Sequence, residues 1–286
     1  MSRSLQNDCE AGHRALLDTL DAQVRRAAGA DAAVDAAARL RHAQVFLVAG
    51  GAVGVRTAVH LAGLGLRHLT ICPLSAKDLG IFQAPLRASG HANWSVFPHD
   101  FNIYGAAMQL KLHQLLAFAA SMPAPRVQRE LNEAAVRLDI PLVQASVFAH
   151  EVYLGPTVLP GHTACNACYQ TRLKANYGRV DVPEARDRFL DKNPEFEFRG
   201  QLDAIDRLAA ALAASEAERL LGGARPPLAL SREVVVNALT QGRQDSFVPY
   251  VEWCAVCAAS RPRRSDDRFA RFVRETAAAV RQPLQA

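Results

Sequence analysis

The 286-residue sequence contains no long apolar run and few aromatic residues (7%), and only four of its 33 basic residues are lysines. No apolar segment reaches the roughly 20 residues of a transmembrane helix, because Arg or His interrupts each candidate, so we expect no membrane partner. The beginning, MSRSLQNDCEAGH, lacks the apolar centre of a signal peptide, which predicts a cytoplasmic protein. Basic residues are not interleaved with aromatic ones in any stretch, and this argues against nucleic acid as a partner.

The composition is that of a globular protein, since half of the residues are apolar and 21% are charged. The length allows one large domain or two small ones. Strand-like apolar runs alternate with helical patterns, which predicts an α/β fold with a Rossmann-like, mostly parallel sheet and flanking helices. We expect a helical segment at 1–42, a core at 43–264 and a C-terminal helix within 265–286.

The clearest element is the apolar run AQVFLVA at 43–49, which is typical of a parallel strand buried on both faces. GGAVG follows at 50–54, then a helical pattern at 55–64 and a second short strand at 68–72. A strand, a glycine turn, a helix and a strand within about 30 residues predict a right-handed βαβ unit.

Further elements follow from the same patterns. Strands are expected at 115–120, 141–148, 151–160, 233–240 and 246–251, and helices at 125–138 and 201–221. Residues 74–103 contain Pro and Gly and are expected to be irregular.

A glycine turn after a first strand can bring backbone N–H groups and a helix N-terminus to a phosphate. Here Gly50, Gly51 and Gly54 form an incomplete G-x-G-x-x-G, and Arg56 would face a phosphate from the first helical turn. Such a nucleotide site also needs a carboxylate at the end of the second strand, but that strand ends in ICPL at 71–74. The alternative is that the glycines only allow the helix to pack closely on the strand.

Four of the six cysteines form two C-x-x-C pairs, Cys165/Cys168 and Cys254/Cys257. Disulfides are disfavoured in the cytosol, and two such pairs are the usual way to present four thiolates to tetrahedral zinc. Four Cys ligands leave no position for water, so we expect structural and not catalytic zinc. A redox C-x-x-C of the thioredoxin kind, or unrelated buried cysteines, are the alternatives.

Several of these segments together resemble a known family. The strand, glycine turn and helix at 45–64, the strand that begins at Pro141 and the two cysteine pairs resemble the ThiF/MoeB superfamily of ubiquitin-activating-enzyme-like adenylating proteins. LGPTVLPGHTACNACYQTRL at 154–173 is most similar to the branch found in the biosynthesis of thiazole/oxazole-modified peptides. The stretch that ends at the second cysteine pair, VVVNALTQGRQDSFVPYVEWCAVC, also resembles that branch. The resemblance covers residues 40–260.

Residues that adenylating members of this family use are missing from the matching positions. The resemblance implies an acidic residue where Cys72 and Pro73 stand, and an Arg in the segment DLGIFQ at 78–83. It also implies a magnesium-binding Asp near residues 122–124, which read MPA. Since ATP activation needs cationic groups and Mg²⁺ on the phosphates, we expect a member with no catalytic residue that does not adenylate. Two alternative functions remain. The first is an active adenylating enzyme, which would use ATP as a cofactor. The other is an NAD-type oxidoreductase.

Relatives of this type act beside a YcaO-type, ATP-dependent cyclodehydratase, which converts Cys, Ser or Thr residues of a precursor peptide to azolines. The resemblance therefore implies a scaffold that presents a precursor peptide to such an enzyme, as a homodimer or in a complex with it. A leader usually adds a strand to a winged-helix module, whereas residues 1–42 have helical patterns. We expect the Ala/Leu helix at 201–221 to form the contact surface. The alternative is that this helix covers the sheet of its own domain. Its larger apolar residues are Leu202, Ile205, Leu208, Leu212 and Leu220.

Overall fold

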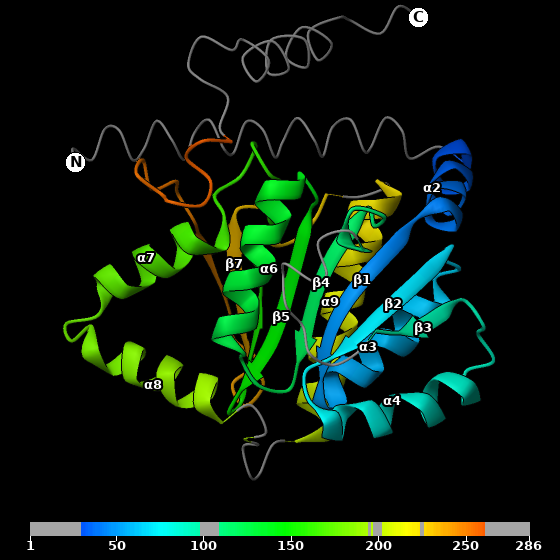
Figure 1. Ribbon diagram of the computed structural model, residues 1–286, viewed down its shortest axis with the longest axis horizontal. Helices are drawn as coiled ribbons and strands as arrows, with labels where there is room; N and C mark the ends of the chain where they lie inside the picture. The colour runs from blue at the N-terminus through cyan, green and yellow to red at the C-terminus, as the bar shows by residue number, and fades with distance from the viewer. Residues whose placement is uncertain (1–29, 98–108, 194–195, 197–201, 224–225, 261–286) are drawn as a thin grey trace, which may run out of the picture.

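A computed structural model describes residues 30–97, 109–193, 196, 202–223 and 226–260, which form one eight-stranded sheet with helices on both faces (Figure 1). The strands are β1 (Gln44–Gly50), β2 (His68–Pro73), β3 (Trp94–Val96), β4 (Leu115–Ala120), β5 (Leu142–Phe148), β6 (Glu151–Leu154), β7 (Arg232–Asn237) and β8 (Arg243–Phe247). The helices are α2 (Ala30–His42), α3 (Gly51–Gly63), α4 (Ala76–Ala88), α6 (Pro125–Leu138), α7 (Asn166–Asn176), α8 (Asp181–Lys192) and α9 (Asp203–Gly222). Within the described part of the chain, no helix is long and apolar enough to cross a membrane.

The strand order is β3-β2-β1-β4-β5-β6-β7-β8. Strands β1 to β5 pair in parallel, and β6 to β8 continue the sheet in antiparallel pairing. The chain leaves β1 toward β2 on one side and later returns to β4 on the other side. A sheet that reverses its winding in this way opens a crevice at the carboxyl ends of the two central strands. The expected α/β fold with a mostly parallel sheet is confirmed.

Residues of β1 alternate between two apolar cores, which explains why the whole strand is apolar. Val45 and Leu47 pack in the first core with α3, α4 and α9, while Phe46 and Val48 pack in the second core with α6. All four side chains are fully buried. Figure 1 shows α6 on the near side of the sheet and α3 and α9 on the far side.

Helix α9 covers its own sheet, so the contact surface expected on it is corrected. Ile205, Ala209, Ala213 and Ala217 are buried in the first core, and α9 packs on α3, β5 and β6. The alanines let the helix approach its neighbours closely, and the same small residues made the helix look like a free apolar face in the sequence. The alternative given for this helix is therefore the correct one.

The segment expected to be irregular holds helix α4 and strand β3, so that prediction is wrong. Ser75 caps α4, because its hydroxyl accepts a hydrogen bond from the Asp78 N–H at 3.2 Å. Pro85 lies inside the helix, while Phe82 and Leu86 anchor it in the first core. Ser three residues before Asp is a helix start signal. The prediction of an irregular segment rested on its Pro and Gly content alone.

The expected segments at the two ends are only partly described. Residues 1–29 and 261–286, including the C-terminal helix expected there, lie outside the described residues. The described part of the N-terminal segment is α2, which packs on α9. There the Arg39 guanidinium donates a hydrogen bond to the Gly222 carbonyl at 3.2 Å.

Candidate functional site

A crevice lies at the carboxyl ends of β1 and β4, where the strand order reverses. Its volume is about 310 Å³, and it is bounded by the starts of α3, α4 and α6 and by the end of α8. Crevices at this position are where open α/β sheets bind their ligands. Gly50 and Gly51 of the glycine turn line this crevice.

The three glycines of the turn have different structural tasks. Gly51 has φ +61°, and a Cβ there would lie 2.6 Å from the Ser121 hydroxyl, so both the backbone and the space require glycine. At Gly54 a Cβ would lie 2.9 Å from the Ala49 Cβ, so this glycine lets α3 lie against the sheet. Both glycines are thus required by close contacts within the protein, and Gly51 also by its backbone conformation.

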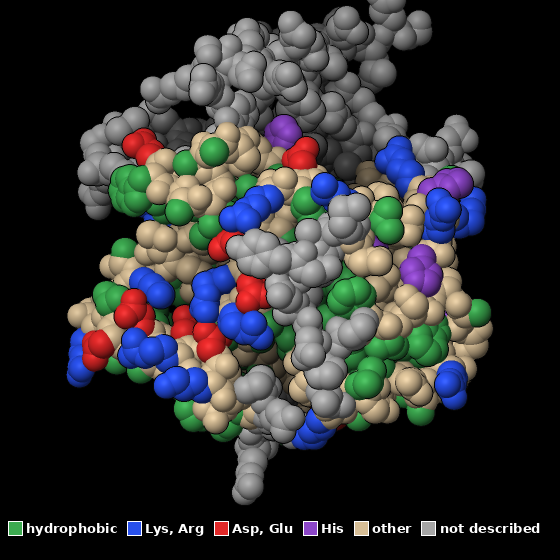
Figure 2. All heavy atoms as spheres, in the orientation of Figure 1, with side chains coloured by type: hydrophobic (Ala, Val, Ile, Leu, Met, Phe, Trp, Pro, Cys, Tyr) green, Lys and Arg blue, Asp and Glu red, His purple; other side chains and the backbone are tan. Residues whose placement is uncertain are grey.

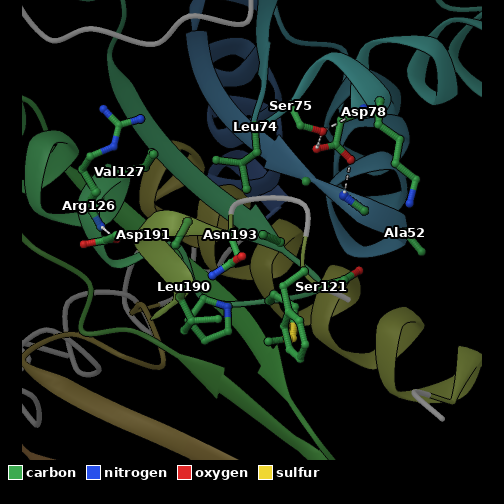
Figure 3. A pocket seen from close by; sticks show the side chains of 18 of the residues that line it. Ala52, Leu74, Ser75, Asp78, Ser121, Arg126, Val127, Leu190, Asp191 and Asn193 are labelled. Atoms are coloured by element: carbon green, nitrogen blue, oxygen red, sulfur yellow. Dashed lines mark hydrogen bonds between the residues drawn. The ribbon is translucent and has the colours of Figure 1, made fainter. Parts of the chain in front are cut away.

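A carboxylate of the chain itself occupies the N-terminus of α3. Asp78 Oδ1 accepts a hydrogen bond from the Gly51 N–H at 2.8 Å, and Asp78 Oδ2 accepts one from the Ser75 hydroxyl at 2.9 Å. Figure 3 shows Asp78 reaching from α4 to this backbone group. The first free N–H groups of a helix are the usual anchor for a phosphate. Here the anchor at Gly51 is filled by Asp78, and the N–H of Val53 donates to Ser121 Oγ at 3.1 Å.

Leu74 packs directly on the glycine turn. A Cβ at Gly50 would lie 2.5 Å from Leu74 Cδ1, so the leucine side chain rests against the glycine backbone. Figure 3 shows Leu74 pointing into the crevice beside the turn. The apolar side chain of Leu74 therefore stands directly after β2, where a nucleotide site would need a carboxylate to bind the ribose.

The N-terminus of α6 is filled in the same way as that of α3. Pro125 has no N–H, and the N–H of Arg126 donates to Asp191 Oδ1 at 2.7 Å. The second oxygen of Asp191 pairs with the Arg129 guanidinium at 2.6 Å. Two helix N-termini that border the crevice are therefore neutralised by carboxylates from α4 and α8.

Arg56 is turned away from the crevice. Its guanidinium forms an ion pair with Asp203 and lies 3.8 Å from a carboxylate oxygen of Asp206, both in the first turn of α9. Arg56 lines a separate apolar groove between α3 and α4. Arg56, which was expected to contact a phosphate, therefore joins α3 to α9 instead.

The four predicted cysteines meet in a second site, at the start of α7. Their four sulfur atoms lie within 4.8 Å of one another, and all four residues are buried. Sγ–Sγ distances are 3.9 Å for Cys165–Cys168, 3.6 Å for Cys165–Cys254 and 3.5 Å for Cys168–Cys257. Tetrahedral zinc with Zn–S bonds of about 2.3 Å needs sulfur atoms about 3.8 Å apart, so the residues fit that ion.

Backbone contacts hold the cysteine cluster in place. Asn132 of α6 accepts a hydrogen bond from the Asn166 N–H at 2.8 Å and so fixes the start of α7. The N–H of Val251 donates to Cys168 Sγ at 3.4 Å. Mutual hydrogen bonding with Cys168 and Cys257, together with burial, raises the pKa of Cys165 far above that of a free thiol. A bound cation is what would hold these groups as thiolates.

A polar contact beside the cluster ties α7 to the antiparallel strands. The Tyr169 hydroxyl donates a hydrogen bond to the Glu233 carboxylate of β7. Burial raises the pKa of Glu233 and of Tyr169. Because Tyr169 follows Cys168 directly in the chain, this bond fixes the helix turn that presents the first cysteine pair.

Comparisons with known proteins agree with this architecture. The chain matches Escherichia coli MccB, solved with ATP, with a TM-score of 0.62 at 18% identity over 78% of this chain and 69% of MccB. The microcin C7 biosynthetic enzyme MccB, solved with N-formylated MccA, matches with a TM-score of 0.62 at 16% identity over 78% and 70% of the two chains. At these identities the matches show a shared fold, so the chain has the fold of MccB.

Two further matches are more partial. The heterocyclase TruD matches the chain with a TM-score of 0.53 at 16% identity, over 78% of this chain and 28% of TruD. Protein HesA from Leptolyngbya boryana is 34% identical over 100 residues, and the match covers 34% of this chain and 28% of HesA. No protein-family model matches the chain.

Asp78, Asp191 and Leu74 are the crevice residues that sequence reasoning missed. Asp78 stands three residues after Ser75, and this start signal could have placed it at a helix N-terminus. No local signal marks Asp191, because it reaches α6 from α8, 65 positions further along the chain. In the sequence, Leu74 shows only that a carboxylate is absent after the second strand.

Proposed function

We propose that this ThiF-type protein is a non-adenylating scaffold in the biosynthesis of a ribosomally made, azole- or azoline-modified peptide. It presents the precursor peptide to a YcaO-type cyclodehydratase. The lack of adenylation is inferred from the hydrogen bond that Asp78 Oδ1 accepts from the Gly51 N–H at 2.8 Å. A nucleotide phosphate at the same N–H would meet a negative charge already in place, and like charges in a partly buried site repel strongly.

The surroundings of Asp78 support the same conclusion. Leu74 covers the glycine turn, Asp191 caps the start of α6, and Arg56 pairs with α9. Phosphoryl chemistry requires positive groups and Mg²⁺ around the phosphates. In the described part of the crevice the basic residues are Lys77 and Arg126, and the Arg126 guanidinium pairs with Glu130 at 3.1 Å.

The second half of the proposal draws on the structural matches. The microcin C7 biosynthetic enzyme MccB was solved with N-formylated MccA, and TruD is a heterocyclase. Both activities support a role in peptide modification, and the motif at 154–173 resembles the azole-forming branch. For the four cysteines we propose one structural zinc ion, which joins α7 to the segment after β8 and supplies folding energy without taking part in chemistry.

The competing function is an active adenylating enzyme that acts on a peptide or on the C-terminus of a sulfur carrier. It is favoured by one observation, the solvent-accessible crevice at the switch point next to Gly51. Pyrophosphate exchange separates the two functions. With ATP, Mg²⁺ and the precursor peptide, we expect no exchange by the full-length protein. Exchange that is lost in Gly51→Ala would overturn the proposal.

Reconstitution tests the scaffold role directly. A YcaO-type enzyme and its precursor peptide are incubated with ATP, with and without this protein, and loss of water per heterocycle is followed by mass spectrometry. We expect the protein to increase the rate at least about tenfold, an effect of about 1.4 kcal/mol on the barrier. An equal rate without the protein would contradict the scaffold role.

A further inference from the structure

Charge is divided unevenly along the chain. Residues 30–124, from α2 through β4, contain seven Lys and Arg and four acidic residues, Asp31, Asp35, Asp78 and Asp100. Residues 125–260, which begin with α6, contain 15 Lys and Arg and 17 Asp and Glu. Asp78 is already bonded to the glycine turn. The segment from α2 through β4 therefore has three more basic than acidic residues, whereas the rest of the chain up to residue 260 has more acidic than basic residues.

Part of this excess gathers at the amino ends of the parallel strands. Three chain segments meet there, because the Arg67 N–H bonds to the Ala43 carbonyl at 2.9 Å and the Gln114 N–H bonds to the Gln44 carbonyl at 2.9 Å. We call the exposed basic residues of this edge, with those at the ends of α2 and α4, the amino-edge patch. Its members are Arg41, His42, Arg67, Arg87, His91 and Lys111.

The amino-edge patch has no acidic partner among the described residues. No ion pair of the described residues involves Arg41, Arg67, Arg87 or Lys111. Figure 2 shows Lys, Arg and His side chains gathered around the end of α2, at the upper right, with no Asp or Glu side chain among them.

The other half of the molecule is arranged differently. There the exposed arginines of α6 and α8 lie beside carboxylates, as in Arg129–Asp191 at 2.6 Å and Arg186–Asp187 at 2.8 Å. Figure 2 shows red and blue side chains alternating on that side. Positive charge is therefore balanced in one half and left unbalanced at the amino-edge patch, and unbalanced charge of one sign attracts a partner of the opposite sign.

An apolar residue in the patch narrows the class of partner. Leu112 is 57% exposed and follows Lys111 in the turn before β4. A leucine beside a lysine adds nothing to a contact with phosphates, but it fits an apolar side chain of a peptide. We propose that the amino-edge patch binds an acidic protein segment that carries an apolar residue among its carboxylates. This site is at the opposite end of the strands from the crevice, so it does not depend on whether nucleotide binds there.

Fluorescence anisotropy tests the proposal with the full-length protein. The probes are a fluorescein-labelled oligoglutamate, the same peptide with one central leucine, and a single-stranded oligothymidylate of equal charge. We expect both peptides to bind at low salt, the leucine peptide more tightly, and binding to weaken as the salt concentration rises. In Arg41→Glu/Arg67→Glu the affinity for both peptides should fall at least about tenfold.

Two further variants make the test specific. Arg137→Glu/Arg188→Glu reverses two equally exposed charges on α6 and α8 and should leave peptide binding unchanged. Leu112→Ser should remove only the advantage of the leucine peptide. Equal losses in the two double variants, or no binding of either peptide, would overturn the proposal. Tighter binding of the oligothymidylate would assign the patch to nucleic acid instead. If the first double variant does not fold, Arg67→Gln/Lys111→Gln takes its place.

Discussion

Replacement of Asp78 by alanine tests the central contact of the crevice. The carboxylate accepts hydrogen bonds at 2.8 Å and 2.9 Å, from the Gly51 N–H and the Ser75 hydroxyl. Hydrogen bonds to a charged group contribute about 1.5–3 kcal/mol each when buried, and Asp78 is only half-buried. We therefore expect Asp78→Ala to lower the free energy of unfolding by about 2–3 kcal/mol.

Thermal and urea unfolding, followed by circular dichroism, measure this change. A loss of 2–3 kcal/mol corresponds to a fall in Tm of about 4–10 °C for a chain of this size. Asp78→Asn keeps the shape and one acceptor but removes the charge at the helix N-terminus, so it should cost about 1 kcal/mol. Asp181→Ala is the matched control, because Asp181 also lies in a first helical turn but its side chain is 62% exposed. It should change stability by less than about 0.5 kcal/mol.

Pyrophosphate binding completes the test. In the wild-type protein the Gly51 N–H is taken by Asp78, and we expect no rise in Tm with pyrophosphate. In Asp78→Ala this N–H and the start of α3 are free, and pyrophosphate should raise the Tm. Equal stabilisation of both proteins, or an Asp78→Ala variant as stable as the wild type, would refute the reasoning.

The remaining predictions concern the metal, α9 and one buried histidine. Purified protein should contain one zinc ion per chain by elemental analysis, and Cys165→Ser should lose it together with several kcal/mol of stability; zinc-free wild type of equal stability would contradict this. Leu208→Asp should unfold the chain in equilibrium denaturation, because Leu208 packs against the first core, whereas Leu202→Asp, at a position 54% exposed, should not. Burial lowers the pKa of His113, so the folded chain binds fewer protons than the unfolded chain as the pH falls below 6.5, the ordinary value for histidine. Stability should therefore decrease below about pH 6.5, and His113→Phe should flatten this slope in urea titrations.

The sequence predicted those parts of the fold that depend on local pattern. The βαβ unit at 43–72, the helix at 125–138 and the four cysteines are each marked by apolar periodicity, a glycine turn or a paired motif. Strands β1 and β5 lie within two residues of their predicted bounds. Such signals arise from neighbours in the chain, so a single sequence carries them.

The parts that the sequence did not predict depend on contacts between distant segments. Asp191 caps α6 from another helix, and Arg56 pairs with α9, a partner more than 140 positions away. Neither spacing nor composition records such a pairing. Helix α9 shows the same limit, since its alanines fit both an interface and a core, and only the position of α3 and β5 decides between them.

The cysteine cluster also has a consequence for the order of events during synthesis. Cys165 and Cys254 are 89 positions apart, and all of α8, α9, β7 and β8 lies between them. While a ribosome makes the chain, β1 to β5 can pair long before the second cysteine pair emerges. The nascent protein would therefore pass through a stage with a paired parallel sheet and two unligated thiols at the start of α7. Under the proposed zinc site, metal capture then closes the loop between the two cysteine pairs, and a zinc shortage during growth would leave the parallel half formed and the antiparallel half unfastened.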